Sequence, residues 1–284
     1  TEEEAQLRHL VALYPNDLWS LRELAIRLAD QQRWDEAEHF ARASLSRAPL
    51  LAASHGTLAL VQIRRSGYAA AEAALREAVR LDVDYRYALS TLIEDAPDKT
   101  CADEAIAFVR AELIRQVTIG DALLGFQESA RVWLSPEALL PPLHEAFEAR
   151  PDLWQTWVSY GSQLTRSGQA DAALALFAEA VEKFPALPRL FVEYAQALKS
   201  LGRRDEARAQ AARALEISPG WNRAVRLYVD TCTESGTHWD DAIAALKRAL
   251  VREPSDADLR GLLGWVFEQR ADYDWPIRAG NVGS

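Results

Sequence analysis

Histidine, cysteine and paired carboxylates are the side chains of this sequence that could bind a metal ion or transfer protons. No two histidines lie four residues apart, as a zinc-binding pair on one helix face would, because the five stand at His9, His39, His55, His144 and His238. Cys101 and Cys232 lie 131 positions apart, which is typical of neither a metal site nor a disulfide framework. The glycine-bearing stretches lack the spacing and the lysine of a phosphate-binding loop. The sequence therefore predicts no catalytic residue, no metal site and no cofactor.

The overall charge restricts the classes of partner. The 284 residues include 32 basic and 42 acidic side chains, which gives a formal net charge of -10. Nucleic acids and anionic membrane surfaces attract clustered positive charge, so neither is expected as the main partner. No apolar run approaches the roughly 20 residues of a transmembrane helix, so membrane insertion is not expected either.

The N-terminal residues and the choice of basic residues give weaker indications of origin. The stretch TEEEAQLRHL is not a secretory signal, which favours a cytoplasmic location. Because the chain begins with Thr1 and not with methionine, we expect a trimmed fragment, and removal of a targeting segment stays an open alternative. Arginine outnumbers lysine 28 to 4, a bias that suggests a GC-rich bacterial genome.

Proline and small residues recur at a fixed spacing. Five prolines are separated by 34, 102, 34 and 34 residues, all multiples of 34: Pro15, Pro49, Pro151, Pro185 and Pro219. Pro254 follows after 35 residues, and Val83 and Val117 occupy the two skipped slots. A small residue recurs with the same period at Ala37, Ala71, Ala105, Ala173, Ala207 and Ala242, with Leu139 as the exception.

This period predicts pairs of amphipathic helices that stack on one another. Apolar residues at positions i, i+3, i+4 and i+7 give each helix one apolar face. Alanine where two helices cross allows their backbones to approach closely, and the terminal proline ends the second helix because it cannot continue the hydrogen-bond ladder. A single pair cannot bury both of its faces, so neighbouring pairs must pack together.

The pattern resembles the tetratricopeptide repeat family, whose consensus is W-x2-L-G-x2-Y, then A-x3-F, then A and P. One repeat carries this pattern at Trp157, Tyr160, Gly161, Leu164, Ala173, Phe177, Ala180 and Pro185. The resemblance covers about residues 2–270. It implies an all-α fold, a right-handed superhelical solenoid of antiparallel helix pairs.

The repeats divide the chain into one solenoid domain, 1–270, and a tail or linker, 271–284. Full repeats are expected at 18–51, 52–85, 86–119, 120–153, 154–187, 188–221 and 222–256, with half-repeats at 2–14 and 257–270.

The segment 95–142 is expected to be irregular. Pro97 should end the first helix of its repeat early, and Pro141–Pro142 should interrupt a helix that begins at Ser135–Pro136. This segment is either a tolerated kink or a hinge at which a partner or another domain docks.

In the family, positions two, five, nine and twelve of each first helix line the concave groove. The resemblance therefore implies a partner-binding surface at Trp19, Ile26, Leu60, Tyr87, Arg189, Lys199, Arg223 and Arg226. The last four could together hold a carboxylate or a phosphate. Two alternatives stay open: Arg226 pairs with Asp230 four residues later, and Trp19 only packs at an array end.

The resemblance implies a non-catalytic scaffold or adaptor that binds a protein or peptide, such as an acidic or C-terminal segment, in this groove. The end helices could also support self-association or the docking of another domain. The alternative is a receptor or regulatory arm of a larger enzyme, such as a glycosyltransferase, that recruits its protein substrate.

Overall fold

The computed structural model describes residues 2–116, 120–234 and 236–280, with side chains as far as Ala271. These residues form sixteen α-helices and no strand, and none of the helices is both long and apolar enough to cross a lipid bilayer. Val117, which the sequence places in a proline slot, and the last four residues of the expected tail lie outside the described residues.

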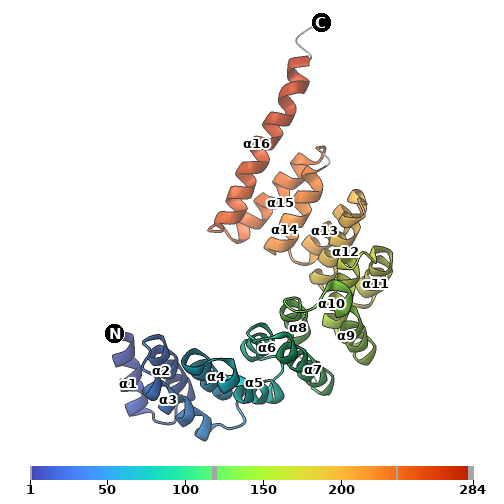
Figure 1. Cartoon of the computed structure of the whole chain (residues 1–284). Coiled ribbons are helices and arrows are strands. Elements are labelled where there is room, and N and C mark those ends of the chain that lie inside the picture. Colours follow the sequence, from blue (N-terminus) through green and yellow to red (C-terminus); the bar gives the residue numbers. More distant parts are fainter. Residues whose placement is uncertain (1, 117–119, 235, 281–284) are drawn as a thin grey trace. The chain divides into compact units, whose positions relative to one another are not determined.

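The chain divides into two compact units, Thr1–Ala149 and Arg150–Ser284. The first unit contains α1 (Glu2–Leu13), α2 (Leu18–Asp30), α3 (Trp34–Arg47), α4 (Ala52–Ser66), α5 (Tyr68–Leu81), α6 (Arg86–Glu94), α7 (Lys99–Arg115), α8 (Ala122–Ala130) and α9 (Pro136–Ala149). The second contains α10 (Trp154–Arg166), α11 (Ala170–Lys183), α12 (Pro188–Ser200), α13 (Arg204–Ile217), α14 (Asn222–Thr233), α15 (Trp239–Arg252) and α16 (Ala257–Gly280). Within each unit, consecutive helices are joined by short turns and pack as pairs (Figure 1). The predicted all-α class of stacked helix pairs is confirmed.

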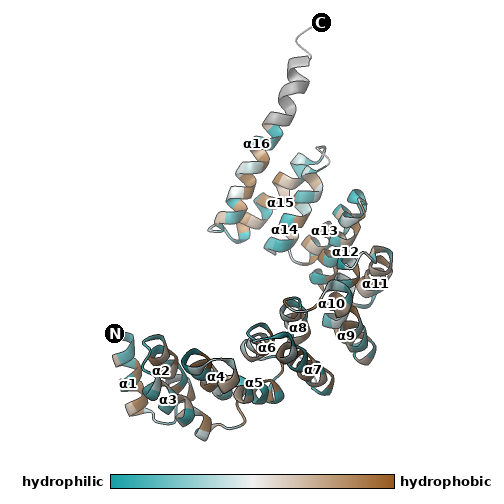
Figure 2. Ribbon diagram, in the orientation of Figure 1, coloured by the Kyte–Doolittle hydropathy of each residue, from teal (hydrophilic) through white to brown (hydrophobic). Residues whose placement is uncertain are grey.

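Small side chains lie where the helices of a pair cross. All six alanines of the recurring slot are fully buried, and so is Leu139, the exception to the pattern. The helices carry hydrophobic and hydrophilic residues side by side along their length (Figure 2), as amphipathic packing requires. The predicted role of this slot as a close helix contact therefore agrees with the structure.

One first-helix slot uses two different side chains to make the same hydrogen bond. Trp157 of α10 is buried, and its Nε1 donates to the carbonyl oxygen of Pro151 at 2.9 Å. His55 of α4 occupies the equivalent slot, and its Nε2 lies 2.8 Å from the carbonyl oxygen of Pro49. Because a carbonyl only accepts, Nε2 of His55 must carry the proton. Each side chain thus fixes its first helix to the end of the preceding repeat.

Helix α6 is short, and two neighbouring elements supply partners for its C-terminal carbonyl groups. The helix ends at Glu94, three residues before Pro97, as predicted. The last carbonyls of a helix have no partner within it. The hydroxyl of Tyr68 donates to the carbonyl of Leu92 at 2.8 Å, and Nε1 of Trp133 donates to that of Ile93 at 2.8 Å. The side chains of α5 and of the turn after α8 therefore terminate α6.

Replacing Trp133 by phenylalanine should lower the free energy of unfolding by about 1–2 kcal/mol, because the carbonyl of Ile93 then loses its donor while most of the ring packing remains. Urea unfolding followed by circular dichroism measures this change. Trp19→Phe is the matched control: the Trp19 side chain is exposed, and the substitution should change stability by less than about 0.5 kcal/mol. Equal effects of the two substitutions would contradict this account of how α6 ends.

The expected interruption of the second helix at Pro141–Pro142 is wrong. Helix α9 is continuous from Pro136 to Ala149 with both prolines inside it. The two prolines remove two backbone donors, but Leu139, Pro142 and Leu143 are buried in the first unit. Arg110 of α7 also donates from Nε to Glu145 at 2.9 Å. Packing of this face therefore outweighs the local preference of proline to end a helix.

The expected boundary between helix and tail at residue 270 is also wrong. Helix α16 continues ten residues farther, to Gly280, and includes Pro276. One proline removes a single backbone donor, whereas a continued helix pairs the backbone groups on either side of it. The tail predicted at 271–284 is thus helical as far as Gly280.

A ring of charged side chains fastens α1 to the following repeat. Glu4 accepts from Arg8 Nε at 2.8 Å and from Arg33 Nη1 at 2.7 Å. Glu36 accepts from Arg8 Nη2 at 2.6 Å and from Arg33 Nε at 2.7 Å. These bonds lower the pKa of Glu4 from about 4.5 to about 2, through Arg8 first and then Arg33, and they also lower the pKa of Glu36.

The ring should stabilise the first unit above the ordinary pKa of glutamate and lose that effect as the pH falls through the folded-state value. A carboxylate with a lowered pKa favours the folded state only while it is ionised. The melting temperature of the wild type should exceed that of Glu4→Gln at pH 7, and the difference should shrink between about pH 4.5 and pH 2. Thermal unfolding at several pH values measures it, and a difference unchanged at pH 2 would contradict the assignment.

Candidate partner-binding surface

In the first unit, α2 presents three of its side chains at one helical spacing. Trp19, Arg22 and Ile26 follow each other at intervals of three and four residues, which places them on one face of the helix. Trp19 is 54% exposed, which is unusual for so large an aromatic ring, and Ile26 is partly buried. The alternative that Trp19 only packs at the end of the array therefore accounts for less than half of its side chain.

Two aromatic residues lie next to this surface: Tyr85, directly before α6, packs against α4, and Tyr87 lies on α6. Gly56 of α4 makes room for Tyr85, because a Cβ atom at this position would lie 2.3 Å from the tyrosine ring. Tyr85 and Tyr87 form an edge-to-face pair with ring centroids 6.2 Å apart, and both rings are partly buried. Burial raises the pKa of both phenols. Leu60 packs against the apolar core of the first repeats.

Tyr85 is a member of this surface that the sequence-based prediction missed. Tyr85 lies directly before α6, so the spacing of residues along a helix face does not predict its position. The available signal is Gly56, since a glycine inside a helix often marks a close approach by another group. We name the set Trp19, Arg22, Ile26, Gly56, Leu60, Tyr85 and Tyr87 the N-terminal aromatic surface.

In the second unit, two of the predicted basic residues meet at a buried carboxylate. Glu193 of α12 has a side chain only 6% exposed. Its Oε1 accepts from Arg189 Nε at 2.8 Å and from Arg223 Nη2 at 2.7 Å. Arg189 lies on the same helix and Arg223 on α14, so the carboxylate links two neighbouring repeats. The i,i+4 spacing of Arg189 and Glu193 was the signal that could have identified this residue.

The other two predicted cations are also paired with acids. Lys199 Nζ lies 2.7 Å from Glu234 and 3.6 Å from Asp230. Arg226 donates from Nε to the side-chain oxygen of Asn222 at 2.7 Å, and its Nη2 lies 3.2 Å from Asp258 of α16. The alternative pairing of Arg226 with Asp230 is therefore not formed.

The positively charged surface expected in the second unit is balanced within the chain. Its four cations, Arg189, Lys199, Arg223 and Arg226, contact four carboxylates, Glu193, Asp230, Glu234 and Asp258. A ligand carboxylate must therefore compete with an internal one for every cation. We name these residues the C-terminal charged surface.

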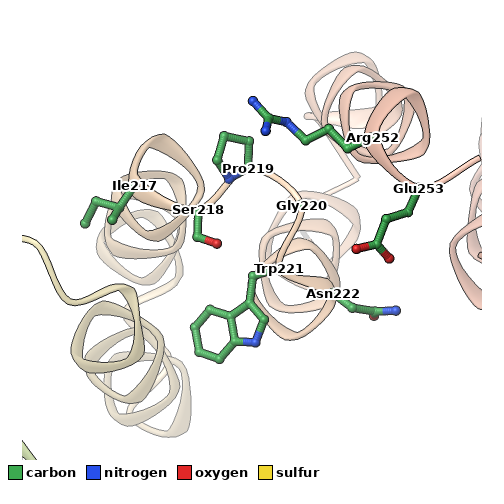
Figure 3. A pocket seen from close by; sticks show the side chains of 8 residues that line it. All are labelled: Ile217, Ser218, Pro219, Gly220, Trp221, Asn222, Arg252 and Glu253. Carbon is green, nitrogen blue, oxygen red and sulfur yellow. The ribbon is translucent and has the colours of Figure 1, made fainter.

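A surface hollow of about 610 Å³ lies at the turn between α13 and α14. Figure 3 shows Trp221 and Asn222 on this turn, with Arg252 and Glu253 from the end of α15. A hollow of about 570 Å³ occurs at the turn Leu13–Asp17 in the first unit. The prolines of these two turns, Pro219 and Pro15, are six 34-residue periods apart, so the hollows recur with the repeat and do not mark a separate site.

The described residues hold no group of three or more histidine, cysteine, aspartate or glutamate side chains that could bind a metal ion. Cys101, on the first turn of α7, is partly exposed, and Cys232 of α14 is buried. Burial raises the pKa of Cys232 to about 11, so this thiol stays protonated at neutral pH. Neither thiol is thus placed as a nucleophile.

Similarity to known structures agrees with this architecture. Yeast Tom70 is 13% identical in sequence, with a TM-score of 0.54 over 98% of this chain and 59% of Tom70. TTC0263, a TPR protein of Thermus thermophilus, is 21% identical with a TM-score of 0.38, over 75% of this chain and 98% of its own. At such identities the likeness to Tom70 concerns the fold alone.

Comparison of sequences identifies the repeats themselves. No curated protein matches the sequence of this chain. A family model described as tetratricopeptide repeat matches residues 164–229, and a second model of the same description matches residues 236–274. These matches show tetratricopeptide repeats at residues 164–229 and 236–274, where the 34-residue period and the stacked helix pairs also occur.

Proposed function

We propose that this chain is a non-catalytic scaffold that binds an extended peptide segment of a partner protein along the first helices of its repeats. Tetratricopeptide repeats are protein-interaction modules in general, and this coarser role follows from the family. The observation that carries the finer proposal is the N-terminal aromatic surface, on which Trp19 is 54% exposed and Tyr85 and Tyr87 form an edge-to-face pair of partly buried rings.

Large aromatic side chains are suited to such a role. They bury a large area for the loss of few rotatable bonds, and they are enriched among the residues that contribute most to binding. Ile26 of α2 and Leu60 of α4 are partly buried apolar residues, and these two helices pack directly against each other. An apolar or aromatic side chain of the partner is therefore the expected occupant of this surface.

The C-terminal charged surface is a separate candidate surface, on the second unit. Its cations keep between 29% and 49% of their side chains exposed, so a polar segment of the partner can reach them. Because every cation already has an acidic neighbour, an acidic ligand gains less here than the basic residues alone suggest. We propose that this surface contributes selectivity more than affinity for a polar segment that binds to the second unit.

Selection of random 12-residue peptides on the immobilised chain tests the proposal. Enriched peptides are synthesised with a fluorophore, and their affinity is measured by fluorescence anisotropy. Trp19→Ala should weaken binding by at least about tenfold, as for a central aromatic contact. The control is Val251→Ala, which removes a side chain that is 80% exposed at the end of α15. Enrichment of no peptide, or equal affinity of wild type and Trp19→Ala, would contradict the proposal.

A further inference from the structure

Arg22 differs from the cations of the second unit because it has no internal anion. Its side chain forms no ion pair or hydrogen bond with any described residue, and its Nη1 atom is buried without an acceptor. Arg189, Lys199, Arg223 and Arg226 each contact a carboxylate. Arg22 thus has no ion-pair or hydrogen-bond partner, and its Nη1 atom is also shielded from water.

The residues near Arg22 include one tyrosine and one aspartate whose pKa values it affects. It lies on α2 between Trp19 and Ile26, and its charge opposes the rise that burial causes in the pKa of Tyr85. Arg22 also slightly lowers the pKa of Asp17, whose carboxylate lies at the start of α2 and accepts from the backbone nitrogen of Ser20 at 2.9 Å. The guanidinium group is therefore partly desolvated close to Tyr85, while the carboxylate of Asp17 is held by the backbone of Ser20.

A partly desolvated charge without a counterion is unfavourable in the free protein, and an anionic ligand relieves that cost. A carboxylate matches a guanidinium group through paired hydrogen bonds, whereas a phosphate dianion is better held by several cations. The chain also has a formal net charge of -10, which opposes the approach of a multiply charged ligand. These considerations favour a single carboxylate.

We infer that Arg22 binds the side-chain carboxylate of an aspartate or glutamate in the partner peptide, next to an apolar residue that contacts Trp19. This deepens the proposed function and rests on it. Along a helix axis Trp19 and Arg22 are separated by about 4.5 Å, and successive residues of an extended peptide advance by about 3.3 Å. The acidic and the apolar residue of the peptide are therefore one or two positions apart.

The test uses the peptides selected on the complete chain, each synthesised with an amidated C-terminus so that only side chains can supply the carboxylate. Affinities are measured for the wild type, Arg22→Gln, Arg22→Lys and the control Arg27→Gln. Arg27 lies on the same helix but pairs with Glu3 at 3.5 Å. Each peptide is also made with its acidic residue replaced by the matching amide.

Arg22→Gln should lower the affinity for the acidic peptides by about tenfold or more. Arg22→Lys should lower it by less, and Arg27→Gln by less than about twofold. Replacing glutamate by glutamine in the peptide should cause the same loss, and Arg22→Gln should then have little further effect. The peptide substitution keeps the test valid even if Arg22→Gln folds poorly.

The outcomes separate this inference from the proposed function. If peptides bind and depend on Trp19, but carry no acidic residue or bind Arg22→Gln as tightly as the wild type, the inference is wrong and the proposed function stands. If no peptide is enriched, both are wrong.

Discussion

Replacing Glu193 by alanine should lower the free energy of unfolding by about 3 kcal/mol. Removal of one partner from a buried ion pair leaves uncompensated charge and typically costs about 3–5 kcal/mol. Here two arginines, Arg189 and Arg223, lose the same acceptor and are left close to each other. The cost should lie at the lower end of the range, because 31% and 38% of their side chains remain exposed to water.

Chemical unfolding of the wild type and four variants measures this effect: Glu193→Ala, Arg223→Ala, their double variant and a control. The control is Glu216→Ala, which removes an exposed carboxylate paired with Arg213 on α13 and should cost less than about 0.5 kcal/mol. The double variant Glu193→Ala with Arg223→Ala should be less destabilised than the sum of its single variants, because the unpaired charge is then removed as well. Equal effects at Glu193 and Glu216 would show that the buried carboxylate is not a link between repeats.

Replacing Gly161 by alanine should lower the free energy of unfolding by about 2 kcal/mol. A Cβ atom at this position would lie 2.6 Å from Cζ and 2.8 Å from Cε1 of Phe177, and the ring of Phe177 is fully buried. Overpacking of a filled core costs about 1–3 kcal/mol, which exceeds the gain of about 0.5–1 kcal/mol that alanine brings to a helix interior.

The matched control is Gly261→Ala in α16, where no atom lies within 4 Å of an added Cβ. This substitution should raise stability, since only the helix preference changes. Comparison of the two unfolding midpoints therefore separates close packing from backbone preference. Stabilisation by Gly161→Ala would mean that α10 and α11 do not approach as closely as described.

The architecture was predictable from the sequence because its signals are periodic. The 34-residue spacing of proline and the recurring alanines depend only on the order of residues, and each of those alanines is buried where helices cross. The prediction was wrong where tertiary packing outweighed a local preference of the sequence. Pro141 and Pro142 favour the end of a helix, but burial of Pro142 and its neighbours keeps α9 continuous.

The candidate site was predictable only in part. The resemblance to tetratricopeptide repeats predicted that Trp19 and Tyr87 lie on the groove face of the first helices, but it did not predict which charged side chains form ion pairs with each other. Arg226 contacts Asp258, 32 positions later, and not Asp230 four positions later. Which acid Arg226 contacts depends on how neighbouring repeats pack together, and the sequence of a single repeat does not determine this packing. The isolation of Arg22 is likewise a property of the assembled surface.

Ion pairs between successive repeats limit how far these modules are interchangeable. Arg64 of α4 contacts Asp30 at the end of α2 at 2.5 Å, and Arg270 of α16 contacts Asp240 of α15 at 2.7 Å. Exchanging two repeats would preserve the shared apolar slots but set these arginines against unmatched neighbours. Ion pairs between neighbours therefore determine the order of the repeats, whereas the small and apolar residues that they share determine the fold of each repeat.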